Sequence, residues 1–198
     1  MSFNKFIKDK DGWDLLSEEE KYSNAHLQVC EAKVRTPTRP GGCQWTVVHR
    51  KGAVVVAPMT ENREIVLVRQ ERVPIRETLW ECPAGQIDES TEHDAKTIRA
   101  TALRELREEA GFELGVGGEL VPLGHFFSSA GFTDEHAHLF LARPVVACAS
   151  GPEHDEHEAI VECRAFPAAE IRRMIASNEI RDANTLAIYA RLSAMGLC

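Results

Sequence analysis

Short apolar runs dominate the middle of the chain, and they predict buried strands. Residues 53–57 and 65–70 consist largely of valine, leucine, isoleucine and alanine. Runs of this length between polar or turn residues are typical of strands buried on both faces. Similar or alternating patterns predict further strands at residues 27–35, 44–50, 79–83, 120–127, 138–142 and 161–166.

Three segments have the apolar spacing of amphipathic helices. Residues 92–110 carry apolar side chains three or four positions apart: Ala95, Ile98, Ala102 and Leu106. This spacing places them on one helical face, and Gly111 is a suitable end for the helix. Residues 167–175 and 182–195 predict two more helices. Strands that alternate with helices predict an α/β domain with a mixed sheet.

The first 50 residues hold too little apolar mass for a core of their own. For residues 1–25 we expect an extended or partly helical arm, in which Ser17 to Glu20 begin a helix. We therefore divide the chain into residues 1–50, an arm with a small β appendage, and residues 51–198, the main domain. Such an appendage packs on the main domain or on a partner subunit.

Composition and charge exclude several classes of protein. The 198 residues include 23 Lys and Arg against 31 Asp and Glu, a net charge of -8. An acidic protein is a poor match for nucleic acid. No apolar run reaches the roughly 18 residues of a membrane span, and the first ten residues do not resemble a secretion signal. We expect a cytoplasmic protein with reduced cysteines, without membrane or nucleic-acid partners, whose anionic ligands need a bridging cation.

Three carboxylates crowd the end of the helix predicted at residues 92–110. Glu105, Glu108 and Glu109 are one turn apart or less. Like charges at this spacing destabilise a helix, and near its C-terminus they oppose the helix dipole. One interpretation is a solvated acidic face, which is common. The other is a site for Mg²⁺, which prefers oxygen ligands and bridges carboxylates to phosphates.

The segment around these carboxylates resembles the signature of the Nudix hydrolase family. Residues 104–112, Arg-Glu-Leu-Arg-Glu-Glu-Ala-Gly-Phe, match the second half of that signature at every specified position. Gly85 precedes Arg104 by 19 positions, whereas the family pattern has 14, so the chain carries a five-residue insertion between them.

The insertion leaves the first glutamate of the signature open. Glu89 and Glu92 are the two candidates. Glu92 is preferred because Ser90 or Thr91 could cap a helix that begins there.

Flanking motifs resemble one branch of the family, the ADP-ribose and ADP-sugar pyrophosphatases. These motifs lie at residues 68–72, 79–88 and 128–135, and the resemblance extends over residues 44–192. It implies an α/β/α sandwich with a mixed sheet and a homodimer built through the N-terminal appendage. It also implies dependence on Mg²⁺, with Mn²⁺ as an alternative.

The resemblance also implies a role for each residue of the signature. Glu105, Glu109 and the backbone carbonyl of Ala84 would bind the metal, Glu108 would lie close by or bridge, and Arg104 would orient a carboxylate.

The acidic segment at residues 155–160 corresponds to a loop that carries a catalytic glutamate in this branch. Glu156 is preferred as the base that deprotonates water and Glu158 as a further metal ligand, although the order is open. A solvated polar loop is the competing interpretation.

Several residues outside the signature are candidates for binding substrate. Arg72 and, less strongly, Arg50 are candidates for the substrate phosphates or the terminal ribose, because an arginine fork suits phosphate oxygens. Glu81 interrupts an apolar strand, Glu135 could accept hydrogen bonds from a ribose, and Trp45 and Phe132 could stack on adenine.

The leading hypothesis is metal-dependent hydrolysis of a nucleoside diphosphosugar, with ADP-ribose giving AMP and ribose 5-phosphate. A second hypothesis keeps the fold and changes the ligand to GDP-mannose or an NADH-type dinucleotide. A third is a catalytically idle Nudix domain that binds a nucleotide as a sensor. The intact glutamates at 105, 108 and 109 argue against the third.

Overall fold

The computed structural model describes residues 7, 10–87, 94–154 and 159–198. Four glutamates singled out by the sequence lie outside the described residues: Glu89, Glu92, Glu156 and Glu158. The described chain forms a seven-stranded sheet with three helices, and a separate three-stranded sheet at the N-terminus.

The larger sheet is mixed, as the sequence predicts. Its strands run in the order β10-β5-β4-β9-β8, with β6 paired to β5 and β7 paired to β4. The β4–β9 pair is parallel, and the other strand pairs of this sheet are antiparallel. The strands are β4 (Ala53–Thr60), β5 (Glu64–Arg72), β6 (Glu77–Glu81), β7 (Ala84–Gln86), β8 (Phe112–Phe127), β9 (His136–Ala147) and β10 (Ile160–Pro167).

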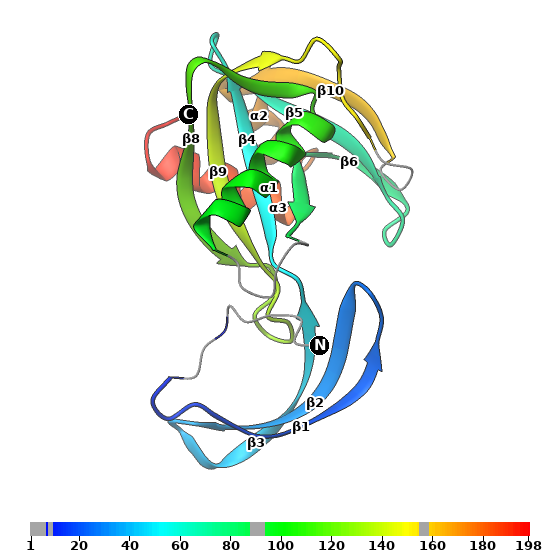
Figure 1. Cartoon of the computed structure of the whole chain (residues 1–198), viewed down its shortest axis with the longest axis vertical. Coiled ribbons are helices and arrows are strands. Elements are labelled where there is room, and N and C mark those ends of the chain that lie inside the picture. Colours follow the sequence, from blue (N-terminus) through cyan, green and yellow to red (C-terminus); the bar gives the residue numbers. More distant parts are fainter. Residues whose placement is uncertain (1–6, 8–9, 88–93, 155–158) are drawn as a thin grey trace.

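Helices cover both faces of this sheet (Figure 1). Helix α1 (Ala95–Glu108) covers one face, and α2 (Ala168–Ala176) and α3 (Ala183–Ala194) cover the other. Successive residues of a strand point to opposite faces. In β4, Val54 packs into the core beneath α1, whereas Val55 packs into the core beneath α2 and α3. This confirms the α/β/α sandwich and explains why the β4 run is apolar throughout.

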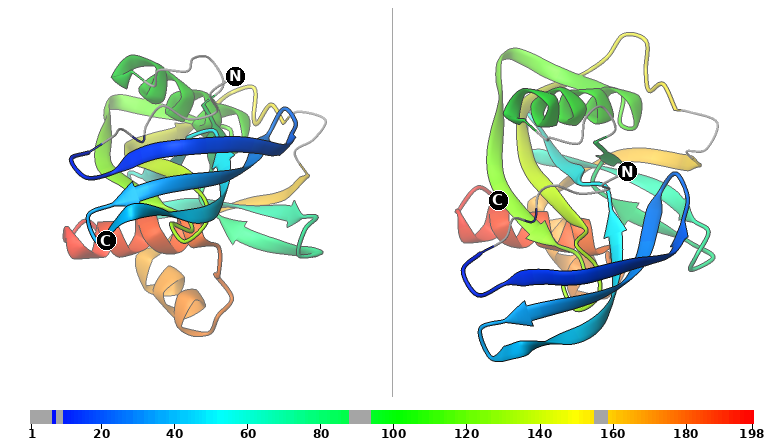
Figure 2. Two further views of the ribbon diagram at one scale, coloured as in Figure 1. Left: turned by 90° about the horizontal axis from the view of Figure 1, so that it is seen from below. Right: turned by 60° about the horizontal axis from the view of Figure 1, so that its bottom comes forward.

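The N-terminal sheet is antiparallel and lies beside one end of the sandwich (Figure 2). It contains β1 (Asp14–Ser23), β2 (Leu27–Thr36) and β3 (Arg39–Arg50), in that order. Only Lys51 and Gly52 separate β3 from β4. Every residue of β1 is exposed, which agrees with the small apolar content of this region.

The helix predicted to begin at Ser17 to Glu20 is wrong, because these residues lie within β1. They pair with β2, for example Glu18 with Ala32 and Glu20 with Cys30. Backbone pairing along the whole strand overrides the local helix signal of the glutamate run.

The predicted start of the next helix is also wrong. Helix α1 begins at Ala95 instead of residue 92, and its cap is Asp94, whose side chain accepts a hydrogen bond of 2.7 Å from the Thr97 N–H. Gly111 follows the helix with φ +69°, a conformation that favours glycine. Strand β8 then begins at Phe112, earlier than predicted, because its pairing with β9 reaches back to Ala147.

The described helices include none that is long and apolar enough to cross a membrane. The six cysteines are free, and Cys82 is buried in the core as expected.

Candidate active site

Two carboxylates of the signature are buried at the C-terminal end of α1. Glu105 is only 2 % exposed and Glu109 only 3 %. Burying charged groups is costly unless they are paired or bind a metal. A solvated acidic face is therefore excluded for these two residues.

The short strand β7 supplies the backbone that faces these carboxylates. The Ala84 N–H donates a hydrogen bond of 2.8 Å to Glu109 Oε2. A Cβ added at Gly85 would lie 2.0 Å from Glu105 Oε1, so the carboxylate occupies space that only glycine leaves open. Sequence reasoning missed the close contact between Gly85 and Glu105, and the only available signal was the fixed place of this glycine in the signature.

Arg104 holds the other side of this cluster. Its Nη2 lies 2.5 Å from Glu105 Oε1, and its Nη1 donates a hydrogen bond of 2.6 Å to Glu108 Oε2. Glu108 is more exposed than the two buried glutamates. Arg104 therefore orients two carboxylates at once, by charge-assisted hydrogen bonds. The pure oxygen donor set of this cluster fits a hard divalent cation such as Mg²⁺.

Arg72 and Glu81 form a second charged pair beside this cluster. Arg72 Nε donates to both Glu81 oxygens, at 2.9 and 3.2 Å, and Arg72 Nη2 donates to Oε2 at 2.5 Å. Burial raises the pKa of Glu81, and the hydrogen bonds from Arg72 oppose that rise. Glu81 and the nearby Glu109 both help to hold the pKa of Arg72 above its usual value.

A cavity of about 360 Å³ opens beside this pair, on the β5–β6 hairpin. It is lined by Glu71, Arg72, Val73, Arg76, Glu77 and Thr78. Arg72 thus offers a positive charge at the edge of an open space.

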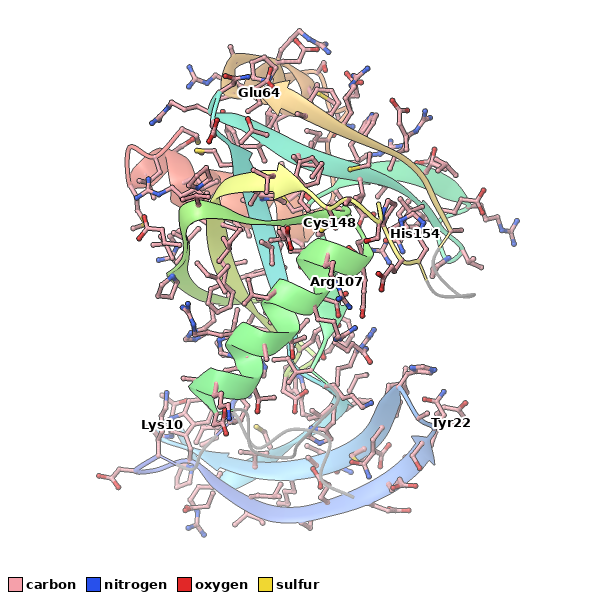
Figure 3. The ribbon with its side chains drawn as sticks, turned by 45° about the horizontal axis from the view of Figure 1, so that its top comes forward. Lys10, Tyr22, Glu64, Arg107, Cys148 and His154 are labelled. Atoms are coloured by element: carbon pink, nitrogen blue, oxygen red, sulfur yellow. The ribbon has the colours of Figure 1, made fainter. Side chains whose placement is uncertain are left out.

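The segment that follows β9 docks on the C-terminal end of α1. The Glu153 N–H donates a hydrogen bond of 2.9 Å to the Glu108 carbonyl, and His154 Nε2 lies 3.1 Å from the Glu109 carbonyl. Figure 3 shows His154 beside this end of the helix, near Arg107. These contacts satisfy carbonyls that a helix end leaves unpaired. Beyond the undescribed residues 155–158, the Ala159 carbonyl accepts a hydrogen bond of 3.0 Å from Glu71 N–H.

The remaining candidates gather in a second group, where residues 128–135 lie against β3. Trp45 Nε1 donates a hydrogen bond of 2.7 Å to the Gly131 carbonyl, and Arg50 Nε lies 3.1 Å from Glu135 Oε1. Trp45 and Phe132 are about half exposed, at 49 and 52 %. The rings are therefore open to a ligand, while Arg50 and Glu135 are already paired with each other.

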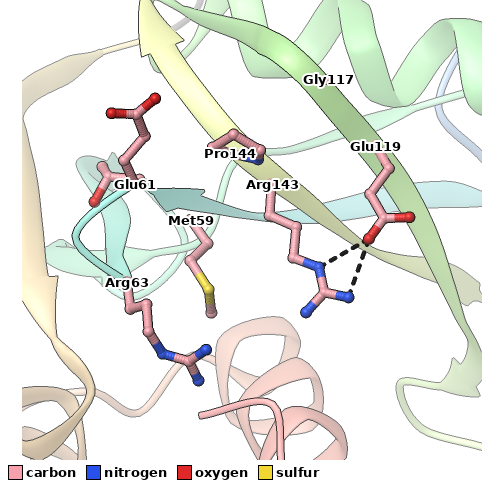
Figure 4. Close-up of a pocket in the computed structure, with 8 residues that line it drawn as sticks. Met59, Glu61, Arg63, Gly117, Glu119, Arg143 and Pro144 are labelled. Carbon is pink, nitrogen blue, oxygen red and sulfur yellow. Dashed lines mark hydrogen bonds and ion pairs between the residues drawn. The ribbon is translucent and has the colours of Figure 1, made fainter.

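A further cavity of about 360 Å³ lies at the other end of β4, away from the carboxylates of α1 (Figure 4). It is lined in part by Met59, Arg63 and Gly117, and Arg143 pairs with Glu119 on its wall at 3.0 Å. None of the residues that line it is a candidate site residue, so this cavity is not part of the candidate site.

Comparisons with known proteins agree with this geometry. The NUDIX domain family model matches residues 48–187. The chain is 31 % identical over 170 residues to the ADP-ribose pyrophosphatase of Bacillus subtilis, a match that covers 86 % of each chain. It is 33 % identical over 183 residues to the ADP-ribose pyrophosphatase of Mycobacterium tuberculosis, covering 91 % of this chain and 82 % of that relative.

A solved structure shares the fold. The crystal structure of an ADP compounds hydrolase aligns with a TM-score of 0.71 at 18 % identity, over 97 % of this chain and 100 % of that one. The family model, the two relatives and the buried glutamates of α1 lead to one conclusion: the chain belongs to the Nudix family of hydrolases.

Proposed function

We propose that this protein hydrolyses the diphosphate bond of ADP-ribose and releases AMP and ribose 5-phosphate. The observation that carries the proposal is the buried pair Glu105 and Glu109, held by Arg104 and by the backbone at Ala84 and Gly85. The names of the two relatives, both ADP-ribose pyrophosphatases, favour this substrate within the family.

The cluster would hold Mg²⁺, or Mn²⁺ in its place. Glu105, Glu109 and the carbonyl of Ala84 are the proposed ligands, with Glu108 close by and Glu158 as a further ligand. Bound there, the cation would offset the charge of the diphosphate and lower the pKa of water. Arg104 keeps the carboxylates in place because it pairs with both Glu105 and Glu108.

The proton of the attacking water goes to a glutamate of the segment 155–158, with Glu156 as the preferred base. The described residues on both sides support this proposal. Glu153 and His154 contact the end of α1, and Ala159 contacts Glu71 beside Arg72. As water attacks one phosphorus, the bond from that phosphorus to the bridging oxygen breaks, and the second phosphate leaves.

Two groups of residues are assigned to substrate binding, one at the β5–β6 hairpin and one where residues 128–135 lie against β3. Arg72, steadied by Glu81, would contact phosphate oxygens at the cavity beside it. Trp45 and Phe132 would stack on the adenine, and Glu135 with Arg50 would contact a ribose.

We also propose that residues 1–50 form a dimerisation appendage and residues 51–198 the catalytic domain. The exposed apolar side chains of the first strand support this division: Trp13 lies just before β1, and Leu15, Leu16 and Tyr22 lie on it. Light scattering at micromolar concentration should give the mass of a dimer. A monomer would contradict the assignment.

A substrate panel tests the proposed activity. The protein is incubated with Mg²⁺ and ADP-ribose, ADP-glucose, GDP-mannose or NADH, and the nucleoside monophosphate is measured. We expect the largest kcat/KM for ADP-ribose. A larger value for GDP-mannose or NADH would change the substrate and keep the chemistry. Binding by calorimetry without turnover of any compound would favour a sensor and contradict the hydrolase.

A further inference from the structure

A second group of metal-binding side chains lies on the N-terminal sheet, away from α1. Glu18 is on β1, Cys30 on β2 and His49 on β3. Glu20 pairs with Cys30, and Cys30 pairs with Val47. Because side chains two residues apart share a face of a strand, Glu18, Cys30 and His49 project from the same face of the sheet.

The potential ligand atoms of these three residues converge. One atom from each, a carboxylate oxygen of Glu18, the sulfur of Cys30 and a ring nitrogen of His49, lie within 4.8 Å of one another. The ligand atoms of a tetrahedral zinc site are about 3.3–3.8 Å apart. Small side-chain movements would close the difference.

A carboxylate orients the ring of His49, as is usual for histidines that bind metals. His49 Nδ1 lies 2.6 Å from Asp134 Oδ2, and His49 Nε2 lies 3.0 Å from Glu18 Oε1. Asp134 is itself fixed, because its Oδ1 accepts a hydrogen bond of 3.0 Å from the Arg50 N–H. A carboxylate on one ring nitrogen directs the other toward a metal and increases its basicity.

Charge and accessibility agree with a cation at this position. Cys30 is 1 % exposed, and Glu18, Glu20 and Asp134 place it in a negative field. The Glu18 side chain is 34 % exposed, which leaves an approach from solvent. Sulfur, nitrogen and oxygen together are the donor set of zinc, whereas Mg²⁺ takes oxygen alone.

We propose that Glu18, Cys30 and His49 form a zinc site with Asp134 as its positioning residue. The fourth ligand position is left for water. The metal would tie the three strands of the N-terminal sheet together. Through Asp134 it would also fix residues 128–135 against β3. Without a metal, the same contacts would be a histidine that bridges two carboxylates, and binding of Co²⁺ separates the two cases.

Cobalt substitution tests this site through a signal that does not depend on hydrolysis. The metal-free full-length protein is titrated with Co²⁺, and the thiolate-to-cobalt charge-transfer absorption is recorded in the near ultraviolet. We expect one equivalent of Co²⁺ to develop the band, and Zn²⁺ to displace it. The glutamates of α1 cannot produce this band because they offer only oxygen, so the result is independent of the proposed hydrolase.

Matched variants assign the signal. Cys30→Ser should abolish the band, whereas Cys163→Ser, a change at an exposed cysteine of β10, should leave it intact. Asp134→Asn should weaken Co²⁺ binding by roughly 10- to 100-fold, the usual cost of losing the partner of a histidine ligand.

Glu18→Gln covers the case in which Cys30→Ser fails to fold. Glu18 lies on an exposed strand, so the variant should fold, which circular dichroism checks, and bind Co²⁺ at least roughly tenfold more weakly. Absence of the band in the folded wild-type protein, a band that survives Cys30→Ser, or unchanged affinity in Glu18→Gln would each overturn the zinc site.

Discussion

The carboxylates of α1 and the group formed by Glu18, Cys30 and His49 on the N-terminal sheet offer a cation two different sets of donor atoms. Around α1, Glu105 and Glu109 present oxygen atoms only, from one helix turn backed by a strand. On the N-terminal sheet, Glu18, Cys30 and His49 present oxygen, sulfur and nitrogen from three strands. The first set suits a hard cation that meets phosphates, and the second suits a zinc ion that ties strands together.

The largest effect is expected from Glu109→Gln, which removes one charge from the α1 cluster. Metal-assisted charge stabilisation contributes several kcal/mol to such reactions, so kcat with ADP-ribose should fall by roughly 100- to 1000-fold. Glu119→Gln, at an exposed carboxylate of β8, is the matched control and should leave kcat unchanged. Near-full activity of the Glu109 variant would refute the assignment.

Gly85→Ala should have the next largest effect, without touching a charged residue. The added Cβ would meet the Glu105 carboxylate at 2.0 Å, and the flexible side chain would move away from the cluster. We expect kcat to fall roughly 100-fold, which is about 2.7 kcal/mol, while the melting temperature changes little. Gly41→Ala, where a Cβ meets nothing within 4 Å, should behave as wild type. Equal activity of the two variants would contradict the close packing of β7 and Glu105.

Arg72→Lys tests whether the site extends from the carboxylates of α1 to an arginine that binds the substrate phosphates. A lysine cannot reproduce the paired hydrogen bonds to Glu81, and it offers phosphate a point charge in place of a fork. Steady-state kinetics with ADP-ribose should show kcat/KM reduced by about tenfold, a loss of about 1.4 kcal/mol. An unchanged kcat/KM would exclude Arg72 from phosphate binding.

The smallest effect on turnover is expected at the N-terminal sheet. A chelator would remove metal from both sites. Adding back Mg²⁺ alone would restore metal only at the carboxylates of α1, and not at Glu18, Cys30 and His49. With saturating ADP-ribose, this protein should retain its kcat within about twofold, yet melt at a lower temperature than the sample that also received Zn²⁺. Binding at 100 times the Kd stabilises a protein by about 2.7 kcal/mol, which corresponds to several degrees in a chain of this size. Identical melting curves with and without Zn²⁺ would contradict a zinc site on the N-terminal sheet.

Sequence patterns predicted the α/β domain with a mixed sheet because the signals of its elements are local, whereas the α/β/α sandwich was implied by the family resemblance. The apolar run of β4, the periodic face of α1 and the glutamates at 105, 108 and 109 each lie within a short window. Burial on both faces and the helical period leave a clear mark on such windows. The placement of Trp45 against residues 128–135 is a contact between distant segments, and the sequence suggested only that each ring could bind a base.

The features that the sequence predicted wrongly or missed also have physical reasons. Ser17 to Glu20 carry a helix-start signal, but pairing with β2 decides their structure. The start of α1 was misplaced because several residues before it could cap a helix, and Asp94 is the one that does. The Glu18–His49 and His49–Asp134 contacts join residues 31 and 85 positions apart, and no short window contains them.

The central claim is that Glu105 and Glu109 bind the divalent cation needed for hydrolysis of ADP-ribose. The most direct measurement is AMP formation by the metal-free protein as Mg²⁺ is added, run in parallel for the wild type and for Glu109→Gln. The account predicts no AMP before Mg²⁺ is added, saturable turnover in the wild type as Mg²⁺ rises, and little or none in the variant. Turnover without a divalent cation, or a variant that follows the wild-type curve, would contradict it.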